Sequence, residues 1–598
     1  MEKSKGTTSK SFLPPGEHRS LTFIFSSQNQ SFYPLSLTSV IMLSILPLIL
    51  YLLTPFLLGA AAATLFRKQD VTSGPIAASI SMPLDHFNAS DTRIFSNRYW
   101  MNDTYYQPGG PVFMSDAGEA GLSDAAAAFV LSSSTIVFAP LELAIKYHGI
   151  ALLWEHRFYG GSMPFEVDNL TGVALAGYDA YKYLNNEQAL EDAVYFATNF
   201  QPPGYSEEEA ESMRADKSPW IWIGGSYPGT RAAIIRERNP DVFFASWASS
   251  APVQAQVQMS VYYNPVYQNM PNNCSADVHA TVTYADSILT TGSEEEVELL
   301  KKAVFLTNSA NPRNVTFAES AEKLSYWNIS QILSYPFQSS FFNFQTFGYQ
   351  ESLGTFCNQL ETWNPSNSAP FTSNSNLSIL STNSLDRTPT ASGLAATSGP
   401  SGAKNAFYAY LYSVIQKSIQ DWEWFPQNPR TLPDTASWNW QLCTQFAQFQ
   451  VSQFPSPHNL ISRFYNITNH EAFFCHSMFP YAPPKPDVGA ILKYGGWSMR
   501  PSNVMFTNGE IDPFRTLGVQ SITKINPEAL NRPTTQEVPN CGVPPNGEEV
   551  FGSVWEGQVH GSDLETRNVT FVGSPVEMGL ELFGSALDEW LPCFGRGK

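Results

Sequence analysis

The sequence predicts an α/β protein whose largely parallel β-sheet is interrupted by a mainly helical insertion. From residue 78 to about residue 265, short apolar runs alternate with amphipathic segments, which is typical of successive βα units. Helix-like segments without regular strand alternation follow to about residue 495, and strand-like character returns near residue 500. We therefore expect the middle region to be an insertion into one core rather than a second independent domain.

Length and composition indicate a large folded protein. The chain has 598 residues, well above the roughly 100–200 residues of a typical domain, so an added or inserted domain is expected. Hydrophobic residues make up 43% and charged residues 15%, which excludes wholesale disorder. The net charge of -19 argues against a nucleic-acid partner, because phosphate binding needs a basic surface. A pI near 4.9 suits an acidic medium.

The N-terminal region, residues 1–66, predicts export. Residues 39–66 carry no charge and follow an arm that contains Lys3, Lys5, Lys10 and Arg19. The small residues at 59–63 resemble a signal-peptidase site, so we expect cleavage and a secreted, vacuolar or lysosomal protein. The alternative is an uncleaved anchor of a single-pass membrane protein, because the apolar run exceeds the roughly 20 residues that span a bilayer.

Sequons and cysteines beyond residue 70 fit an exported protein. The candidate glycosylation sites are Asn88, Asn102, Asn169, Asn273, Asn314, Asn328, Asn376, Asn466 and Asn568. An even number of cysteines favours disulfides over buried free thiols, and these are Cys274, Cys357, Cys443, Cys475, Cys541 and Cys593. Their spacing is not that of metal ligands, and we expect neither a metal nor a cofactor.

Residues 78–269 are expected to form the first part of the core. The helix in this part is placed at residues 186–200, where small and apolar residues recur at helical spacing. The expected strands are the apolar runs at 111–114, 134–138, 150–154, 220–223 and 243–248.

Residues 270–499 are expected to form the helical insertion, with helices at 293–304 and 406–422. Small polar residues, Pro and Gly dominate positions 364–404, which we expect to be a flexible surface loop. Residues 500–598 resume the core, and the expected elements are strands at 503–507 and 549–555 and a final helix at 575–591.

A candidate nucleophile follows the strand at 220–223. The apolar run leads directly into Gly224-Gly225-Ser226-Tyr227-Pro228-Gly229, which predicts the sharp strand-to-helix corner of an α/β-hydrolase. Ser226 would be the nucleophile, and the Tyr227 N–H would be the first donor to an oxyanion. Pro228 stands where the G-x-S-x-G pattern has its last Gly, so a glycine-rich βα turn is the alternative interpretation.

Two later loops offer the partners of Ser226. Hydrolases of this fold place their residues in the order Ser, acid, His. Asp512 follows the strand at 503–507, and His560 is the only His after it, so we expect His560 to be the general base and Asp512 its orienting acid. Glu510 is an alternative acid, but Asp512 lies deeper in the turn and precedes Pro513.

Several separated motifs between residues 82 and 598 carry a family resemblance. They include Met82-Pro83-Leu84-Asp85-His86-Phe87, Glu155-His156-Arg157-Phe158-Tyr159-Gly160, residues 186–192, the corner at 224–229 and Asn508-Gly509-Glu510-Ile511-Asp512-Pro513. The chain resembles the prolyl carboxypeptidase, dipeptidyl peptidase II and thymus-specific serine peptidase family, which includes fungal acid prolyl endopeptidases.

The resemblance implies an α/β-hydrolase fold, a Ser226–His560–Asp512 triad and an insertion that roofs the active site. It places a second oxyanion donor at the Glu119 N–H and suggests a Cys443–Cys475 disulfide, with Cys274–Cys357 and Cys541–Cys593 as the remaining pairs. The sequence departs from the family at Gln445, where related chains commonly carry Glu. His86 and His156 precede the corner, so we expect them to be structural.

The leading functional hypothesis is a serine peptidase that cleaves peptides or proteins after proline. Related proteins act as carboxypeptidases, dipeptidyl peptidases or endopeptidases, and the sequence does not separate these modes or indicate an oligomeric state. One alternative is a lipase or esterase of the same fold, although an H-G-G-G oxyanion loop is absent. The other is a catalytically inactive binding module, which the intact Ser, Asp and His oppose.

Overall fold

The computed structural model describes residues 75–132, 137–310, 320–338, 344–367, 370–376, 378–381, 384–424, 431–456, 459–564 and 573–595. The export segment at 1–66, most of the expected strand at 134–138, and the sequons at Asn314 and Asn568 lie outside these residues. Among the helices within the described ranges, none has both the length and the apolar character needed to cross a membrane.

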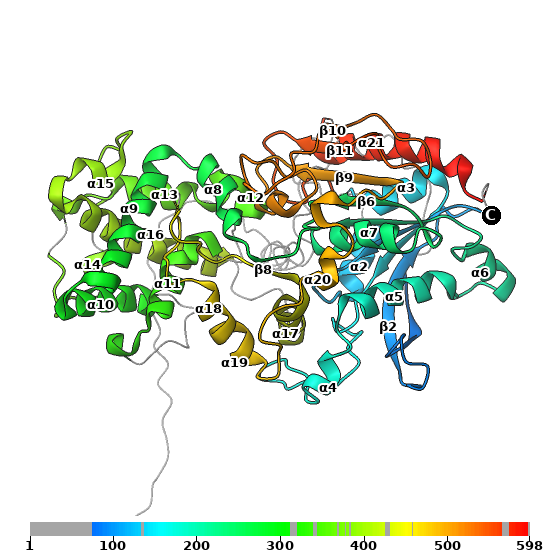
Figure 1. The fold of residues 1–598 in the computed structure, drawn as a ribbon, viewed down its shortest axis with the longest axis horizontal. Coiled ribbons are helices and arrows are strands. Elements are labelled where there is room, and N and C mark those ends of the chain that lie inside the picture. The colour runs from blue at the N-terminus through cyan, green and yellow to red at the C-terminus, as the bar shows by residue number, and fades with distance from the viewer. Residues whose placement is uncertain are drawn as a thin grey trace, which may run out of the picture. The chain divides into compact units, whose positions relative to one another are not determined.

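Among the described residues, a nine-stranded, mostly parallel sheet forms the core and confirms the predicted α/β-hydrolase class (Figure 1). The strand order is β1-β2-β4-β3-β5-β6-β9-β11-β10, and within these described strands only β2 runs opposite to its neighbours. The strands are β1 (Ile76–Pro83), β2 (Ile94–Asn102), β3 (Val112–Asp116), β4 (Ile150–Trp154), β5 (Trp220–Gly225), β6 (Phe243–Ser249), β9 (Val504–Gly509), β10 (Thr534–Thr535) and β11 (Val550–Trp555).

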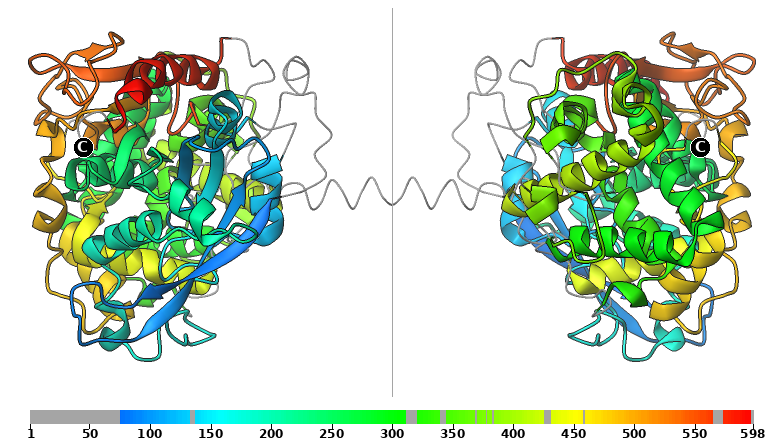
Figure 2. Two further views of the ribbon diagram at one scale, coloured as in Figure 1. Left: turned by 90° about the vertical axis from the view of Figure 1, so that its right-hand side faces the viewer. Right: turned by 90° about the vertical axis from the view of Figure 1, so that its left-hand side faces the viewer.

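Both faces of the sheet are buried, which explains the continuous apolar runs of the central strands. In β5, Trp220 and Trp222 pack into one core and Ile221 and Ile223 into the other, because side chains alternate along a strand. The first core includes α5 (Asn186–Thr198), α6 (Glu207–Met213) and α7 (Tyr227–Arg238). The second includes α2 (Asp124–Ser132), α3 (Ala139–Tyr147) and α21 (Pro575–Trp590), as the two views of Figure 2 allow the reader to follow.

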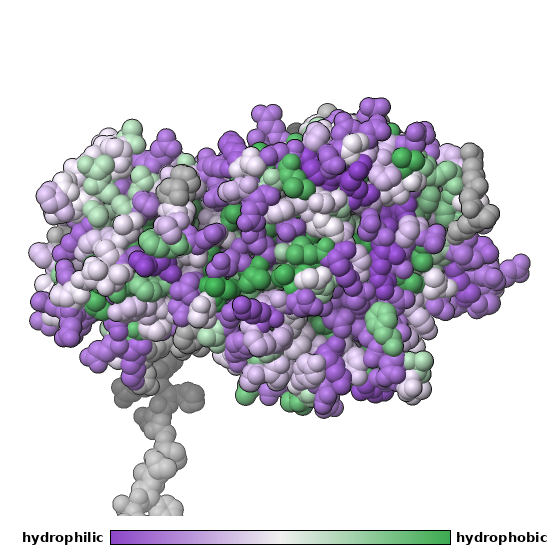
Figure 3. All heavy atoms as spheres, viewed as in Figure 1, coloured by the Kyte–Doolittle hydropathy of each residue, from purple (hydrophilic) through white to green (hydrophobic). Residues whose placement is uncertain are grey.

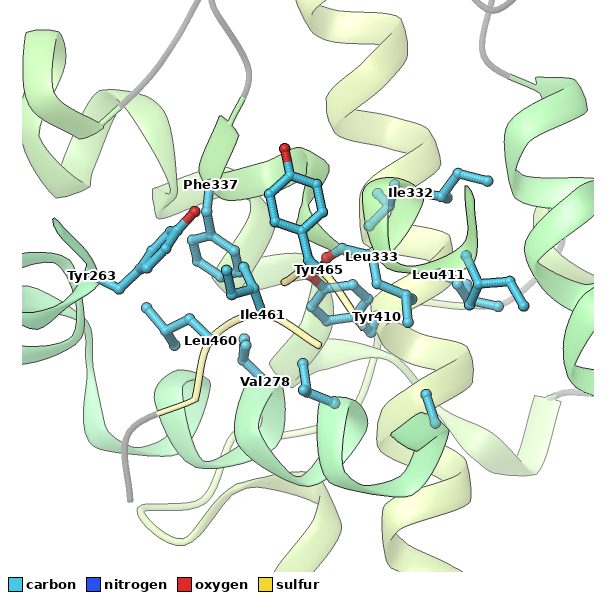
Figure 4. Packing of buried hydrophobic residues seen from close by; sticks show 14 of the residues in the cluster. Tyr263, Val278, Ile332, Leu333, Phe337, Tyr410, Leu411, Leu460, Ile461 and Tyr465 are labelled. Atoms are coloured by element: carbon cyan, nitrogen blue, oxygen red, sulfur yellow. Dashed lines mark hydrogen bonds between the residues drawn. The ribbon is translucent and has the colours of Figure 1, made fainter. Parts of the chain in front are cut away.

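The chain between β6 and β9 is mainly helical and has an extensive hydrophobic cluster of its own. In Figure 4, Leu333, Phe337 and Tyr410 lie at the centre of this cluster, together with Ile461 and Tyr465. The main helices are α8 (Tyr263–Asn269), α9 (Asn272–Thr291), α10 (Glu294–Ala310), α11 (Tyr326–Gln338), α12 (Phe344–Ser352), α13 (Gly354–Thr362), α16 (Gly402–Trp424) and α17 (Leu432–Gln441).

Three disulfides join parts of the chain that are distant in sequence. Cys274–Cys357 links α9 to α13, and Cys443–Cys475 links the end of α17 to a later helical segment. Cys541–Cys593 joins the loop before β11 to the C-terminal end of α21. The pairs are those that the sequence analysis named.

The low-complexity segment at 364–404 is more ordered than the sequence predicts. Its described part buries Phe371, Leu380 and Leu394 and contains the short helix α15 (Gly393–Thr397). The Asp277 carboxylate in α9 accepts the N–H groups of Leu394 at 2.5 Å and Ala395 at 2.8 Å. Neighbouring helices thus supply apolar and polar partners to the described part of a segment whose composition provides few of its own.

Two features of the surface concern its polarity and the candidate glycosylation site at Asn102. Hydrophilic residues cover most of the face in Figure 3, and apolar residues gather near its centre. Asn102 is only 6% exposed, and its Nδ2 donates to the Leu131 carbonyl at 2.8 Å. A glycan at Asn102 is therefore incompatible with this fold, although its sequon is intact.

A buried carboxyl in the insertion makes stability depend on pH. Burial, followed by the neighbouring Asp277 carboxylate, raises the pKa of Glu361 from 4.5 to about 8, and Arg387 and Asn273 oppose the shift only partly. The folded protein therefore holds a proton that the unfolded chain has already lost, and stability falls as pH rises from 4.5 through 8. We expect the Tm of the wild type to fall relative to that of Glu361→Gln over this range, by about 1 °C per kcal/mol for a chain of this length.

The measurement is a thermal melt of both proteins at each pH. Glu351→Gln in α12 is the matched control, because Glu351 is exposed and its substitution should leave the pH profile of the wild type unchanged. Parallel Tm profiles for the wild type and Glu361→Gln would contradict the raised pKa.

Candidate active site

Ser226 occupies a strained corner between β5 and α7. Its φ is +61°, a value that residues with a Cβ rarely adopt. The backbone is held there because the Ser226 N–H donates to the Ser249 carbonyl at 3.0 Å. A Cβ at Gly224 would lie 2.5 Å from the Pro228 carbonyl, and one at Gly229 would lie 2.6 Å from the Ser249 oxygen. The close approach thus requires glycine at 229 rather than at 228, which explains the departure from G-x-S-x-G.

Asp512 binds His560 from the loop that follows β9. Its Oδ2 lies 2.8 Å from His560 Nδ1, and its Oδ1 accepts the Phe514 N–H at 2.8 Å. The Asp512 side chain is fully buried and that of His560 is 11% exposed. The alternative acid, Glu510, instead accepts the Gly557 N–H at 2.9 Å. An imidazole fixed through Nδ1 presents Nε2 as the atom that can exchange a proton.

The end of β6 connects the His560 loop to the Ser226 corner. The Ser249 hydroxyl donates to Asp563, whose other oxygen accepts the Trp555 Nε1–H at 3.0 Å. The Gly561 N–H donates to the Ser250 hydroxyl at 2.9 Å, and Leu564 lies against Gly225. The residues on either side of His560 are therefore fastened beside the corner, at the carboxyl ends of adjacent parallel strands where open α/β sheets bind ligands.

The two candidate oxyanion donors belong to segments that touch. Tyr227 begins α7, and a Cβ on Gly118, which has a φ of +68°, would lie 2.7 Å from Pro228 Cγ in the first turn of that helix. Glu119 follows Gly118, so the loop after β3 lies against the start of α7. Asp116 at the end of β3 forms a fully buried ion pair with Arg231 of α7, although burial raises the pKa of the Asp116 carboxyl.

The helical insertion contacts the His560 loop directly. The His560 N–H donates to the Gln345 carbonyl in α12 at 2.9 Å, and Gln345 Oε1 accepts the Tyr262 hydroxyl at 3.0 Å. The Phe514 ring packs on the imidazole with centroids 5.1 Å apart. Sequence reasoning missed Gln345, because a backbone acceptor leaves no pattern in the choice of side chain.

The side chains of His86 and Gln445 are partly buried and bind core residues. His86 Nε2 lies 2.7 Å from the buried Asp192, which also pairs with Arg157. Gln445 Oε1 accepts the Asn186 N–H at 2.8 Å, so this side chain serves the N-terminus of α5. No cluster of potential metal ligands occurs among the described residues.

Comparison with known proteins gives a consistent family match. The family model described as "Serine carboxypeptidase S28" matches residues 82–530. "Serine protease vicPa" of Bipolaris victoriae (strain FI3) is 27% identical over 464 residues, which cover 76% of this chain and 80% of that protein. "Thymus-specific serine protease" of Mus musculus is 27% identical over 488 residues, with coverages of 76% and 80%. "Probable extracellular serine carboxypeptidase" of Arthroderma benhamiae (strain ATCC MYA-4681 / CBS 112371) is 25% identical over 481 residues, with coverages of 77% and 62%.

The contrast between Asp512 and Glu510 gives a matched pair of variants. We expect Asp512→Asn to slow the labelling of Ser226 by a fluorophosphonate roughly 10³–10⁴-fold, because a neutral amide neither fixes the imidazole tautomer nor stabilises its cation. Glu510→Gln should label within about twofold of the wild type, since its amide oxygen still accepts the Gly557 N–H. Labelling rates measured by mass spectrometry check both, and equal losses would reject Asp512 as the specific partner.

Proposed function

The chain belongs to the serine carboxypeptidase S28 family of serine peptidases, and we propose that it cleaves peptides after proline through Ser226, His560 and Asp512. The observation that carries the proposal is the 2.8 Å contact between Asp512 Oδ2 and His560 Nδ1, on a loop fastened beside the strained Ser226 corner. The substrates are peptides or proteins.

In the proposed mechanism, His560 Nε2 takes the proton of the Ser226 hydroxyl as its oxygen attacks the peptide carbonyl. Asp512 accepts a hydrogen bond from the Nδ1–H group of His560 and stabilises the imidazolium that forms. The oxyanion of the tetrahedral intermediate accepts hydrogen bonds from the backbone N–H groups of Tyr227 and Glu119. The carbon–nitrogen bond then breaks, and His560 returns its proton to the leaving amine. Water, activated by His560, hydrolyses the acyl-enzyme and releases Ser226.

Aromatic side chains near Ser226 and His560 support a preference for proline. Trp438, which is only partly buried, packs on the Tyr227 ring with centroids 5.3 Å apart, and Phe514 packs on His560. An apolar ring such as that of proline is stabilised by apolar and aromatic walls of this kind. We propose release of a carboxy-terminal residue as the first mode to test, since one relative is named as a carboxypeptidase.

The site of action that we propose is the secretory pathway, either outside the cell or in an acidic lumen. A relative that is named as extracellular supports this proposal, and so do the apolar N-terminal segment and the three disulfides.

Replacement of Ser226 tests the nucleophile. We expect Ser226→Ala to lose fluorophosphonate labelling and to lower peptide hydrolysis by at least about 10³-fold, because no acyl-enzyme can form. Ser585→Ala is the matched control, since Ser585 is an exposed serine in α21. Equal labelling of wild type and Ser226→Ala would contradict the assignment and indicate another nucleophile, whereas no labelling of either protein would favour an inactive binding module.

Product masses test the specificity. Proline-containing peptides at acidic pH should be cut on the carboxyl side of proline, and matched peptides with alanine in place of proline should be cut more slowly. Loss of one carboxy-terminal residue indicates a carboxypeptidase, an amino-terminal dipeptide indicates a dipeptidyl peptidase, and internal fragments indicate an endopeptidase. Equal cleavage of the alanine peptides, or ester hydrolysis without peptide hydrolysis, would contradict the proposal.

A further inference from the structure

Helix α17 belongs to the inserted region in sequence, but its buried polar side chains bind loops of the core. Thr431 caps its N-terminus by accepting the Asp434 N–H at 3.2 Å. Asp434, Ser437 and Gln441 are each at most 2% exposed and recur at spacings of three and four residues, so they share one helix face. Ser437 donates to the Phe158 carbonyl at 2.8 Å, which fixes this face on the loop after β4.

Asp434 holds the loop that carries Glu119. Its Oδ2 accepts the Gly121 N–H at 3.2 Å, and its Oδ1 accepts the Gly160 N–H at 2.9 Å. A Cβ at Gly121 would lie 2.3 Å from Gly160 Cα, so the two backbones touch at this point. The buried Asp434 carboxylate therefore bridges the loop after β3 and the loop after β4. The loop after β3 also places Gly118 against Pro228.

Gln441, about two turns after Asp434 in the same helix, binds the side chain of Tyr227. Gln441 Nε2 donates to the Tyr227 hydroxyl at 2.7 Å, and Gln441 Oε1 accepts the Tyr159 hydroxyl at 2.5 Å. The Tyr227 oxygen also lies 2.9 Å from His156 Nε2. The rings of Trp438 and Tyr227 pack with centroids 5.3 Å apart, so α17 contacts Tyr227 through two side chains.

The direction of this hydrogen-bond chain follows from its ends. His156 Nδ1 lies 2.6 Å from the Arg157 carbonyl, which can only accept, so Nδ1 carries the proton. Burial, together with Arg231, holds the pKa of His156 well below its usual range, and the ring stays neutral. Nε2 then accepts from the Tyr227 hydroxyl, which in turn accepts from Gln441. Tyr227 is therefore fixed in one orientation.

We propose that Asp434 and Gln441 are positioning residues for the oxyanion hole, each of them holding one of its two N–H donors in place. Asp434 acts through the loop that bears Glu119, and Gln441 acts through the side chain of Tyr227. Neither residue touches the reacting atoms. The inference rests on the proposed function, because the oxyanion exists only if Ser226 attacks a carbonyl.

Two isosteric variants test the proposal. In Asp434→Asn, an amide NH₂ replaces one acceptor and faces a backbone N–H, which should displace the Glu119 loop. In Gln441→Met, the donor to Tyr227 and the acceptor for the Tyr159 hydroxyl are both lost. Removal of an oxyanion donor costs about 10²–10³-fold in kcat, so displacement of one should cost about tenfold or more. KM should change less than about threefold, because these N–H groups act mainly in the transition state.

Inhibitor binding separates positioning from general damage to the structure. A peptide boronate that forms a tetrahedral adduct with Ser226 should lose affinity in proportion to kcat, whereas the affinity for the cleaved product should stay unchanged. Asn439→Leu is the matched control, because Asn439 is buried in the same helix and its Nδ2 donates to Met478 Sδ at 3.6 Å rather than to either loop. This variant should keep the wild-type kcat.

The outcomes are distinct. Unchanged kcat in both variants, or equal losses of boronate and product affinity, would overturn the positioning role. If Asp434→Asn does not fold, Gln441→Met alone decides whether α17 positions the Tyr227 donor, because the Tyr227 hydroxyl still has His156 as its acceptor. Hydrolysis that survives in Ser226→Ala would overturn the proposed function and the oxyanion hole together, whereas an inactive Ser226→Ala with fully active α17 variants would overturn only the inference.

Discussion

Ser249, at the carboxyl end of β6, connects the two halves of the candidate site. Its carbonyl accepts the Ser226 N–H, and its hydroxyl donates to Asp563, three residues after His560. Ser249 and Asp563 are 314 positions apart, and the helical insertion separates them. The parallel pairing of β6 with β9, and of β9 with β11, brings these segments together. The geometry of Ser226, Asp512 and His560 thus depends on the sheet closing correctly around the insertion.

The insertion contributes direct contacts to the loops of this site. Gln345 in α12 accepts the backbone N–H of His560, and α17 binds the loops on the other side of Ser226. Contacts from buried polar groups in a low-dielectric interior are stronger and more directional than exposed ones, and they leave a high cost if one partner is removed. We infer that such contacts couple the position of the insertion to the geometry of the site.

The sequence predicted the parts of the fold in which local pattern and burial agree. Strands such as β4 and β5 are apolar along their whole length because both faces of the sheet are covered, and they were placed within two residues of their bounds. The β1–β2 hairpin at the edge was missed, because β1 is largely half-exposed or exposed and its pattern is weak. The corner at Ser226 and the order Ser, acid, His needed only local motifs, so these residues could be named.

The contacts of Asp434 and Gln441 could not be predicted in the same way. They join residues 313, 274, 282 and 214 positions apart, and a lone Asp or Gln in a helix has no periodicity that indicates its partner. The order within 364–404 was missed for a related reason. Composition measures what a segment can bury by itself, whereas Leu394 is buried by helices from elsewhere in the chain.

The buried titratable groups indicate how this arrangement tolerates acid. Burial raises the pKa values of Asp286, Asp563 and Glu361. Each of these carboxyls makes the folded protein less stable as pH rises above the usual pKa of a carboxyl. Burial lowers the pKa of His470 from 6.5 to about 4, and it lowers the pKa of His156 as well. Both histidines therefore make the folded protein less stable as pH falls below 6.5. Between the usual pKa of a carboxyl and that of histidine, the effects of the carboxyls and of the histidines oppose each other, which flattens the dependence of stability on pH. Above 6.5 the raised pKa of Glu361, about 8, still lowers the free energy of unfolding as pH rises.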